Sequence, residues 1–220
     1  KVITAGYDTY LAAFEKLIPA LINAFEKNIA PNDSLYTKLK EPITILKNWD
    51  MRCGVNSIAT TLAVEWGQKL IPEIIKSNDE DEFQFVDQVT KTNRFITKAS
   101  AQDLLVPLAS VINELQNKFG KWQLPWGDIN RFQRISSDIE NKFDDSKESI
   151  PVAFASSTWC MLPSYTSRNF TDTKKRYGVH GNSFICAVEF GKKIKAKSLL
   201  AGGESGNPNS KHFFDQGTMY

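Results

Sequence analysis

The hydrophobic and polar positions of the first 120 residues repeat with the period of an α-helix. Apolar side chains recur every three or four residues, which places them together on one face of a helix. Such stripes run over residues 7–25, 58–70 and 104–119. Residues 1–120 are therefore predicted to be mainly helical.

Residues typical of helix ends flank the second and third stripes. Asn56 or Ser57 is placed to accept a backbone N–H bond at the start of the second helix. Ser100 is placed to cap the third helix, with Asp103 in its first turn, where a negative charge is favourable. Gly120 is expected to end this helix, because glycine adopts the left-handed conformation that such ends require.

The pattern changes after Gly120. Residues 121–134 are rich in tryptophan and in turn-forming residues, which predicts a packed irregular loop. Later runs of apolar and alternating residues predict strands over residues 152–159, 183–190 and 193–199. Gly191 suits a hairpin turn between the last two, and the lysines of 193–199 are expected to protect an exposed sheet edge.

Helices followed by strands predict an α+β fold, with helices packed on an antiparallel sheet, and not an alternating parallel α/β fold. We expect residues 1–220 to form a single unit, in which 1–120 is mainly helical and 121–220 contains the loop and the antiparallel strands. Residues 77–82, which read Ser-Asn-Asp-Glu-Asp-Glu, are expected to form an exposed link.

Composition narrows the class of protein. The chain is 41% hydrophobic and 24% charged, with 14 Phe and 5 Trp, as expected of a folded domain with a real core. Its net charge of +2 lacks the basic excess of a nucleic-acid-binding protein, so no nucleic-acid partner is expected. No apolar run approaches the ~18 residues of a membrane span, so no membrane partner is expected either.

The end of the chain contains the residue types of a hydrolytic triad: Ser205, Ser210, His212 and Asp215. Triad members normally come from separate elements, and Gly203-Glu-Ser-Gly206 lacks the spacing of a nucleophile elbow. We therefore interpret this segment as a structural loop. The two histidines, His180 and His212, are far apart and have no second ligand at metal spacing, so no metal site is expected.

The three cysteines, Cys53, Cys160 and Cys186, are widely separated and form no C-x-x-C pair. At most one disulfide could form, which would leave one free thiol. Buried free thiols are the favoured interpretation. The sequence leaves the redox compartment open.

Several stretches together resemble one family. Leu46-Lys-Asn-Trp49-Asp50 precedes Ser57 and a helix that reaches Trp66-Gly67, and residues 126–131 read Trp-Gly-Asp-Ile-Asn-Arg. After Ala187-Val-Glu-Phe190, residues 203–216 read Gly-Glu-Ser-Gly-Asn-Pro-Asn-Ser-Lys-His-Phe-Phe-Asp-Gln. In order and spacing these stretches resemble the penicillin acylase family, whose closing signature is G-x-S-G-x-P-x-S-x-H-x-x-D-Q.

The resemblance implies an N-terminal-nucleophile hydrolase with a four-layer αββα fold, of which this chain is the later part of the large chain. In that family a precursor cuts itself into a small and a large chain. A Ser, Cys or Thr at the start of the large chain then attacks an amide, with its own α-amine as the base. The substrate is a small N-acyl compound such as a penicillin, a cephalosporin or an acyl-homoserine lactone.

Residue 1 is Lys1, which cannot be this nucleophile. The nucleophile, the oxyanion-hole asparagine and the usual calcium ligands are therefore expected upstream, so no cofactor is expected here, and any structural calcium would belong to the complete enzyme. The expected partners are the remainder of the large chain and the small chain. The resemblance also implies a periplasmic or secreted enzyme.

Glu189 is the candidate catalytic residue that the resemblance supplies. In cephalosporin-acylase-like members a glutamate late in the large chain supports a histidine near the nucleophile, and Glu189 is the position that we match to it. The alternative is that Glu189 is a sheet-edge residue facing water. For the chain as a whole, the alternative class is a folded non-catalytic module with a structural or binding role.

Two further expectations concern the burial of the tryptophans and the packing of the last segment of the chain. The side chains of Trp49, Trp66, Trp122 and Trp126 are expected to be buried packing residues. Residues 202–216, which we call the closing loop, are expected to hold the end of the sheet against residues 126–134. Ser210, His212 and Asp215 would then pair backbone groups that lie outside any regular element.

Overall fold

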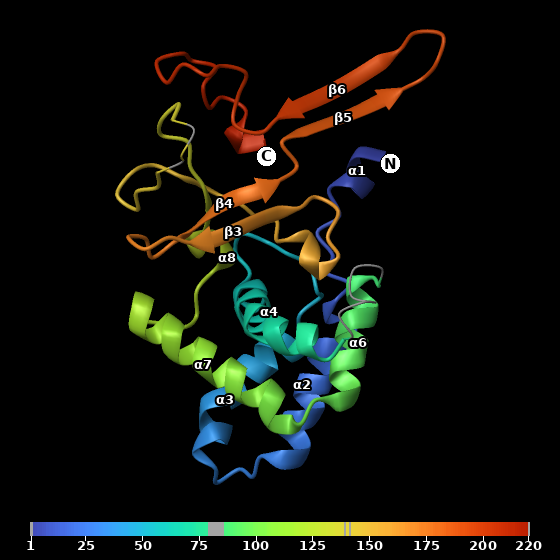
Figure 1. Ribbon diagram of the computed structural model, residues 1–220, viewed down its shortest axis with the longest axis vertical. Helices are drawn as coiled ribbons and strands as arrows, with labels where there is room; N and C mark the ends of the chain where they lie inside the picture. The colour runs from blue at the N-terminus through green and yellow to red at the C-terminus, as the bar shows by residue number, and fades with distance from the viewer. Residues whose placement is uncertain (1, 79–85, 139, 141, 220) are drawn as a thin grey trace.

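The computed structural model describes residues 2–78, 86–138, 140 and 142–219. Helices fill one half of the molecule and strands the other (Figure 1). The helical half contains α2 (Phe14–Asn28), α3 (Ser34–Lys47), α4 (Ile58–Lys76), α6 (Gln88–Lys98) and α7 (Ala101–Phe119). A short helix, α1 (Val2–Gly6), lies away from them, beside the last two strands.

The predicted helix caps are present. Ser57 Oγ accepts a hydrogen bond from the Thr60 N–H at 3.0 Å, at the start of α4. At the start of α7, Ser100 and Asp103 form a reciprocal capping box. Gly120 ends α7 with φ of +79°, a conformation that glycine adopts without a steric penalty. These contacts confirm the predicted starts of both helices and the end of α7.

The helices form a continuous core with part of the later chain. Trp66 is fully buried in α4, and its indole N–H donates to the Leu104 carbonyl at 2.9 Å. Trp159 is also fully buried, and its ring centre lies 4.9 Å from that of Phe14. A Cβ on Gly67 would lie 2.8 Å from the Trp159 ring, so only glycine permits this close approach. The helical and strand-bearing halves are therefore packed as one unit.

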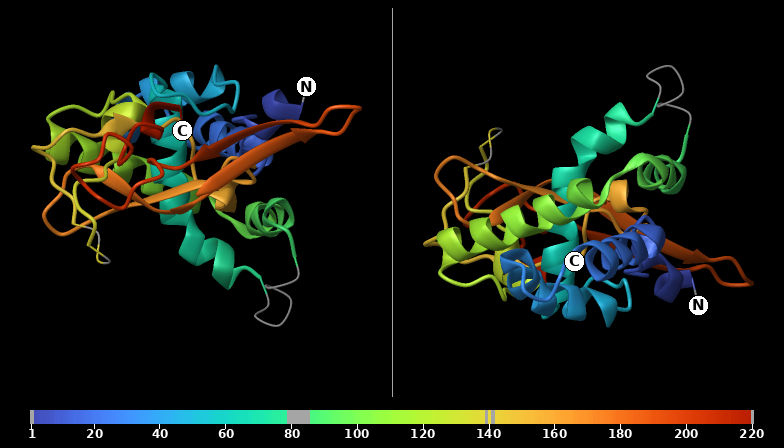
Figure 2. Two further views of the ribbon diagram at one scale, coloured as in Figure 1. Left: turned by 90° about the horizontal axis from the view of Figure 1, so that it is seen from above. Right: turned by 90° about the horizontal axis from the view of Figure 1, so that it is seen from below.

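The strands form a four-stranded sheet and a separate hairpin. The sheet order is β2-β1-β4-β3, with bounds β1 (Asn130–Phe132), β2 (Ile150–Pro151), β3 (Tyr165–Asn169) and β4 (Arg176–Gly181). β1 is preceded by the short helix α8 (Trp126–Ile129). The hairpin pairs β5 (Phe184–Glu189) with β6 (Lys195–Leu200), and Gly191 lies in its turn as predicted. Figure 2 shows that this hairpin projects beyond the rest of the chain.

The α+β class is confirmed, while several boundaries differ from prediction. The β1–β4 pair is parallel, and the other pairs are antiparallel as expected. Residues 121–134 contain α8 and β1 in place of an entirely irregular loop. The apolar stripe begins at Tyr7, but helix α2 begins only at Phe14. The residues before Phe14 are not helical because Tyr10 forms an isolated β-bridge with Arg52. Of the acidic link, residues 79–82 lie outside the described residues.

The predicted strand over residues 152–159 is wrong. Only Ile150–Pro151 pair as a strand, and Ser157–Trp159 form a 3₁₀ turn, η1. The reason is the Asn130 side chain, whose amide donates to the carbonyls of Val152 and Phe154 at 2.8 and 3.0 Å. A side chain thus satisfies the backbone groups that a neighbouring strand would otherwise pair.

Burial of the tryptophans follows the prediction in part. Trp66 and Trp126 are fully buried, whereas Trp49 and Trp122 are half-buried. The indole N–H of Trp49 donates to the Arg52 carbonyl at 3.0 Å. In the described part of the chain no single helix is both long and apolar enough to cross a membrane; α6 and α7 meet the two criteria of length and composition only when taken together, across a bend of 112°.

Candidate functional site

The closing loop is held by its own backbone and by hydroxyl groups. The Ser205 N–H donates to the His212 carbonyl at 3.0 Å, and the Gln216 N–H donates to the Gly202 carbonyl at 2.9 Å. The hydroxyls of Ser205 and Ser210 accept backbone N–H bonds two residues further along, as is usual in tight turns. The chain here is therefore a compact, internally bonded loop outside any helix or strand.

Two glycines make this compactness possible. Gly202 has φ of +90°, which L side chains rarely adopt. A Cβ on Gly203 would lie 2.3 Å from the His212 carbonyl oxygen and 2.8 Å from Asp215 Oδ1. The two arms of the loop thus touch at Gly203, which explains why a larger residue does not fit there.

The closing loop is anchored to the segment after α8, as predicted. Arg134 donates from Nη1 to the Phe213 carbonyl at 2.6 Å, and its guanidinium lies 4.1 Å from the centre of the Phe213 ring. Phe132 packs edge-on against Phe214, with 5.0 Å between ring centres. The Leu200 N–H donates to the Gln216 side chain at 2.9 Å, which ties the loop to the end of β6.

The histidine of the loop forms a pair with Asp215 and no triad. His212 Nδ1 lies 2.7 Å from Asp215 Oδ2, and the two side chains are 55% and 38% exposed. Among the described residues, neither Ser205 nor Ser210 bonds to this ring through its side chain; each hydroxyl is occupied by a turn N–H. The expected pairing of backbone groups thus holds for Ser210, whereas His212 and Asp215 bond to each other. These contacts are those of a structural loop.

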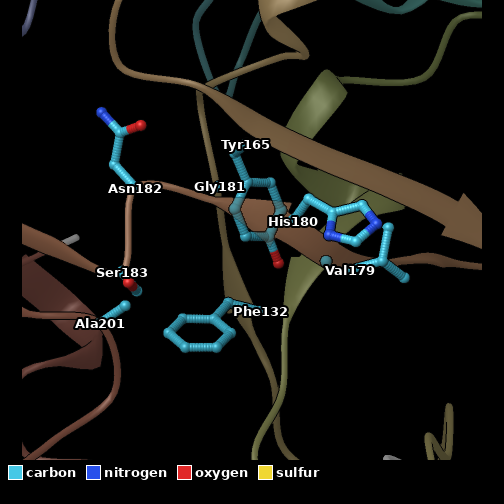
Figure 3. Close-up of a pocket in the computed structure, with 9 residues that line it drawn as sticks. Phe132, Tyr165, Val179, His180, Gly181, Asn182, Ser183 and Ala201 are labelled. Atoms are coloured by element: carbon cyan, nitrogen blue, oxygen red, sulfur yellow. The ribbon is translucent and has the colours of Figure 1, made fainter.

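An open pocket of about 140 Å³ lies where the four-stranded sheet meets the hairpin (Figure 3). Its aromatic wall consists of Phe132 and Tyr165, whose ring centres are 6.2 Å apart. Tyr165 crosses the backbone of Gly178 so closely that a Cβ there would lie 2.3 Å from the phenol oxygen. The phenol donates to the Arg131 carbonyl at 2.7 Å, which fixes the ring.

The rim of this pocket is polar. It is formed by His180, Asn182, Ser183 and the backbone around Ala201. The Ala201 N–H donates to the Ser183 carbonyl at 2.8 Å, so the hairpin closes directly beside the opening. Aromatic walls with a few polar groups suit a small, partly apolar molecule.

The remaining predicted residues do not join this pocket. Glu189 lies at the far end of β5, and its side chain is 73% exposed, 3.8 Å from Lys195 Nζ. Among the described residues, no group of three acidic, histidine or cysteine side chains is placed to hold a metal ion. Cys53 is a buried free thiol as expected, but Cys160 is half-buried and Cys186 is exposed, because it lies on the uncovered hairpin.

An ion pair joins the helices to the sheet. Arg176 of β4 donates to Glu65 of α4 at 2.9 Å, and both side chains are mostly buried. The same guanidinium donates to the Ser167 carbonyl at 2.6 Å, and the Ser167 hydroxyl donates to Asn130 at 2.5 Å. This network fixes the sheet on the helices and so positions the pocket and the closing loop.

A family model described as penicillin amidase matches residues 1–220, the whole length of the chain. The chain belongs to the penicillin amidase family. No curated protein sequence gives a significant match. The family match covers the Trp66-Gly67 pair, the α8 segment and the closing loop, each of which has a specific packing role in the structure.

Sequence reasoning missed two residues that hold the penicillin amidase closing loop, Phe132 and Arg134. They are two residues apart on β1 and its continuation, so their side chains lie on the same side of an extended backbone. Both contact the closing loop. The signal that could have found them is this alternation, in a segment interpreted from the sequence as irregular.

Proposed function

We propose that residues 1–220 are the scaffold and part of the pocket wall of the large chain of an N-terminal-nucleophile amidohydrolase. Membership of the penicillin amidase family implies that the complete enzyme is an amidohydrolase. The scaffold role is supported by the contacts of the closing loop. Its serine, histidine and aspartate side chains all form hydrogen bonds within the loop.

The nucleophile is then supplied by polypeptide outside these residues. In the described part of the chain, the close hydroxyl–carboxylate pairs that lie at helix starts, such as Ser100 with Asp103, are caps. A cap aspartate holds backbone N–H groups at a helix start and is not free to activate a hydroxyl. Acyl transfer needs a nucleophile with an adjacent base, so the family's terminal Ser, Cys or Thr with its own α-amine fills this role.

The substrate that we propose is a small linear N-acyl amide of the penicillin, cephalosporin or acyl-homoserine-lactone type. The reaction adds water across the amide bond and yields a carboxylic acid and an amine. The Phe132–Tyr165 pocket supports this assignment, because its aromatic wall and polar rim suit an apolar acyl group next to a polar amide.

We also propose that Glu189 positions a histidine near the nucleophile. Its exposure and its distant Lys195 partner fit the alternative of a water-facing residue equally. Glu189→Gln in the complete enzyme distinguishes the two roles. A positioning role lowers kcat by ~100-fold or more and alters its pH profile, whereas a surface role leaves both unchanged.

The complete gene product provides the main test. It should be cut into two chains, hydrolyse a chromogenic N-acyl amide, and be recovered from the periplasm or the medium. The purified 220-residue chain should show no turnover. A complete product that is neither cut nor active would contradict the proposal, as would turnover by the 220-residue chain that a single substitution within it abolishes.

A further inference from the structure

A small cleft lies where the last turns of α7 meet the turn between β3 and β4 (Figure 1). The apolar part of its lining comes from Val111, Leu115 and Ile129, and the polar part includes Lys118 of α7 and Asn169 of β3. The volume of the cleft is about 80 Å³. A single buried water needs only ~10–15 Å³, so the cleft has room for a molecule of several heavy atoms.

Lys118 is a half-buried cation without a counter-ion in the described part of the chain. Its ammonium donates to the Asn169 side-chain oxygen at 2.9 Å and lies 5.6 Å from the centre of the Phe119 ring. Both of these partners are uncharged. A charge taken out of water is normally paired with an opposite charge, so the surroundings of this ammonium lack an anion.

The pKa of Lys118 reflects the same imbalance. Burial lowers this pKa from the ordinary value of lysine, and the positive charge of Arg176 acts in the same direction. The carboxylates of Glu65, Asp145 and Glu114 offset this effect only in part. An anion bound beside the ammonium would favour its charged form.

The carboxylates that line the cleft already have cationic partners. Glu65 lies 2.9 Å from Arg176, and Glu114 lies 2.7 Å from Lys69. Lys174 also lines the cleft and forms no ion pair with any described residue. After these pairs are formed, the charges left over at the cleft are those of two lysines. The cleft therefore favours a small anion.

The hydrogen-bond donors of the cleft suit a carboxylate. An ammonium has three N–H donors, and Lys118 directs one of them to Asn169. The Asn169 amide accepts this bond through its oxygen, so its NH₂ group is still a donor and has no partner among the described residues. Donors from two elements match the two oxygens of a carboxylate, and the apolar lining beside them matches a short hydrocarbon part.

We propose that this cleft binds a small aliphatic carboxylate, which accepts hydrogen bonds from Lys118 and Asn169. Its hydrocarbon part packs on Leu115 and Ile129. The ligand joins α7 to β3, beside the ion pair that holds the helices on the sheet, and so stabilises the folded enzyme. Amide hydrolysis releases a carboxylic acid, so the complete enzyme generates ligands of this class. The site does not depend on which amide is hydrolysed, because all its contacts lie within residues 1–220.

The test uses the complete enzyme, with sodium propionate as the probe. Saturation-transfer NMR measures binding, and the melting temperature measures its effect on stability, because a ligand that binds only the folded state raises this temperature with concentration. Sodium chloride at the same ionic strength is the reference, since salt alone alters exposed ion pairs. We expect propionate to bind and to raise the melting temperature above that in chloride; equal melting temperatures overturn the proposal.

A lysine substitution separates this site from propionate bound elsewhere in the enzyme. Lys118→Met removes the cation and should weaken propionate binding at least ~10-fold, because a charge-assisted hydrogen bond is lost. Lys121→Met is the matched control, because this exposed lysine does not line the cleft and its loss should leave binding unchanged. Binding that Lys118→Met leaves at the level of the control contradicts the proposal.

Asn169→Asp gives an independent test if Lys118→Met folds poorly. The new carboxylate would lie beside the Lys118 ammonium and supply the counter-ion from the chain itself. This variant should be at least as stable as wild type in chloride, and propionate should no longer raise its melting temperature. A rise as large as that of wild type would show that the ligand binds elsewhere.

Inorganic phosphate distinguishes a carboxylate from another oxyanion. Phosphate offers acceptor oxygens but no hydrocarbon part to contact Leu115 and Ile129, so it should bind more weakly than propionate. Equal or tighter binding of phosphate overturns the carboxylate assignment. None of these measurements requires hydrolysis of an amide, so failure of this site and failure of the proposed function are distinguishable.

Discussion

The guanidinium of Arg134 lies 4.1 Å from the centre of the Phe213 ring and donates a 2.6 Å hydrogen bond to the carbonyl of the same residue. One side chain thus fixes both the ring and the backbone of the closing loop. A charge-assisted bond to a carbonyl and a cation–π contact each stabilise the folded state by roughly 1–2 kcal/mol. The family's closing signature is therefore held by a residue that lies outside it.

Gly203→Ala should destabilise the loop. The new Cβ would approach the His212 carbonyl oxygen, and backbone cannot move aside as a flexible side chain can. We expect a loss of about 1–3 kcal/mol, the usual cost of overpacking. Urea unfolding of the complete enzyme measures it. Gly206→Ala is the control, because a Cβ at Gly206 meets nothing within 4 Å; equal stabilities of the two variants would refute this account of the loop.

Trp66→Ala should be among the most damaging substitutions in the helical half. The side chain is fully buried, and its loss also leaves the Leu104 carbonyl without its 2.9 Å partner. Large aromatic residues truncated in a core cost about 3–5 kcal/mol. Trp122→Ala, at a half-buried position, should cost clearly less. A melting temperature that Trp66→Ala leaves unchanged would mean that this residue is not part of the core.

Glu65→Gln tests the ion pair between the helices and the sheet. It leaves Arg176 mostly buried without its carboxylate, which typically costs about 3–5 kcal/mol for a buried pair. Glu26→Gln is the matched control, because its 2.7 Å pair with Lys47 is exposed and should contribute at most about 1 kcal/mol. The two variants are compared by urea unfolding. A loss as small as that of the control would show that the pair does not join the two halves.

The Cys53 thiol should contribute to the fall in the free energy of unfolding at alkaline pH. Burial raises the pKa of Cys53, and the nearby Asp50 carboxylate acts in the same direction. In the unfolded chain the thiol ionises near pH ~8.5. Because only the unfolded state then releases the proton, the stability contributed by Cys53 is present below this pH and is lost as pH rises.

Unfolding measured between about pH 7 and pH 10 should therefore show a smaller decline in Cys53→Ala than in wild type. Cys186→Ala, at an exposed position, is the control and should retain the full decline. Identical declines in all three proteins would show that this thiol does not contribute.

The helical half could be predicted largely from local signals. The stripe of α4 and the Ser100–Asp103–Gly120 signals of α7 depend on residues close in sequence, and the structure follows them. Tyr7 to Ala13 continued an apolar period without forming a helix, because Tyr10 pairs with Arg52, 42 residues later. α3 and α6 were not separately predicted, and α6 buries few apolar residues.

The strands β3 and β4 were not predicted, because polar residues share their buried positions with Tyr165 and Tyr177 and break the apolar alternation. Ser167 and Arg176 are buried, and Glu65, the ion-pair partner of Arg176, lies 111 residues before it. A contact between residues so far apart in the chain leaves no periodic pattern in the local sequence. For the site, the packing of the closing loop against residues 126–134 was predicted. The anchor Arg134 was not identified, because its alternation with Phe132 lies in a segment interpreted as irregular and its contact with Phe213 spans 79 residues.

We infer that the closing loop is a structural element of the amidohydrolase and takes no part in the chemistry. The most direct test is turnover per active site of correctly processed Asp215→Ala enzyme. Loss of the 2.7 Å contact with His212 should lower the yield of processed enzyme, while the protein that does mature should turn over an N-acyl substrate at nearly the wild-type rate. A fall of ~100-fold or more at normal stability, the scale of a lost catalytic group, would contradict the account and place the loop in the active site.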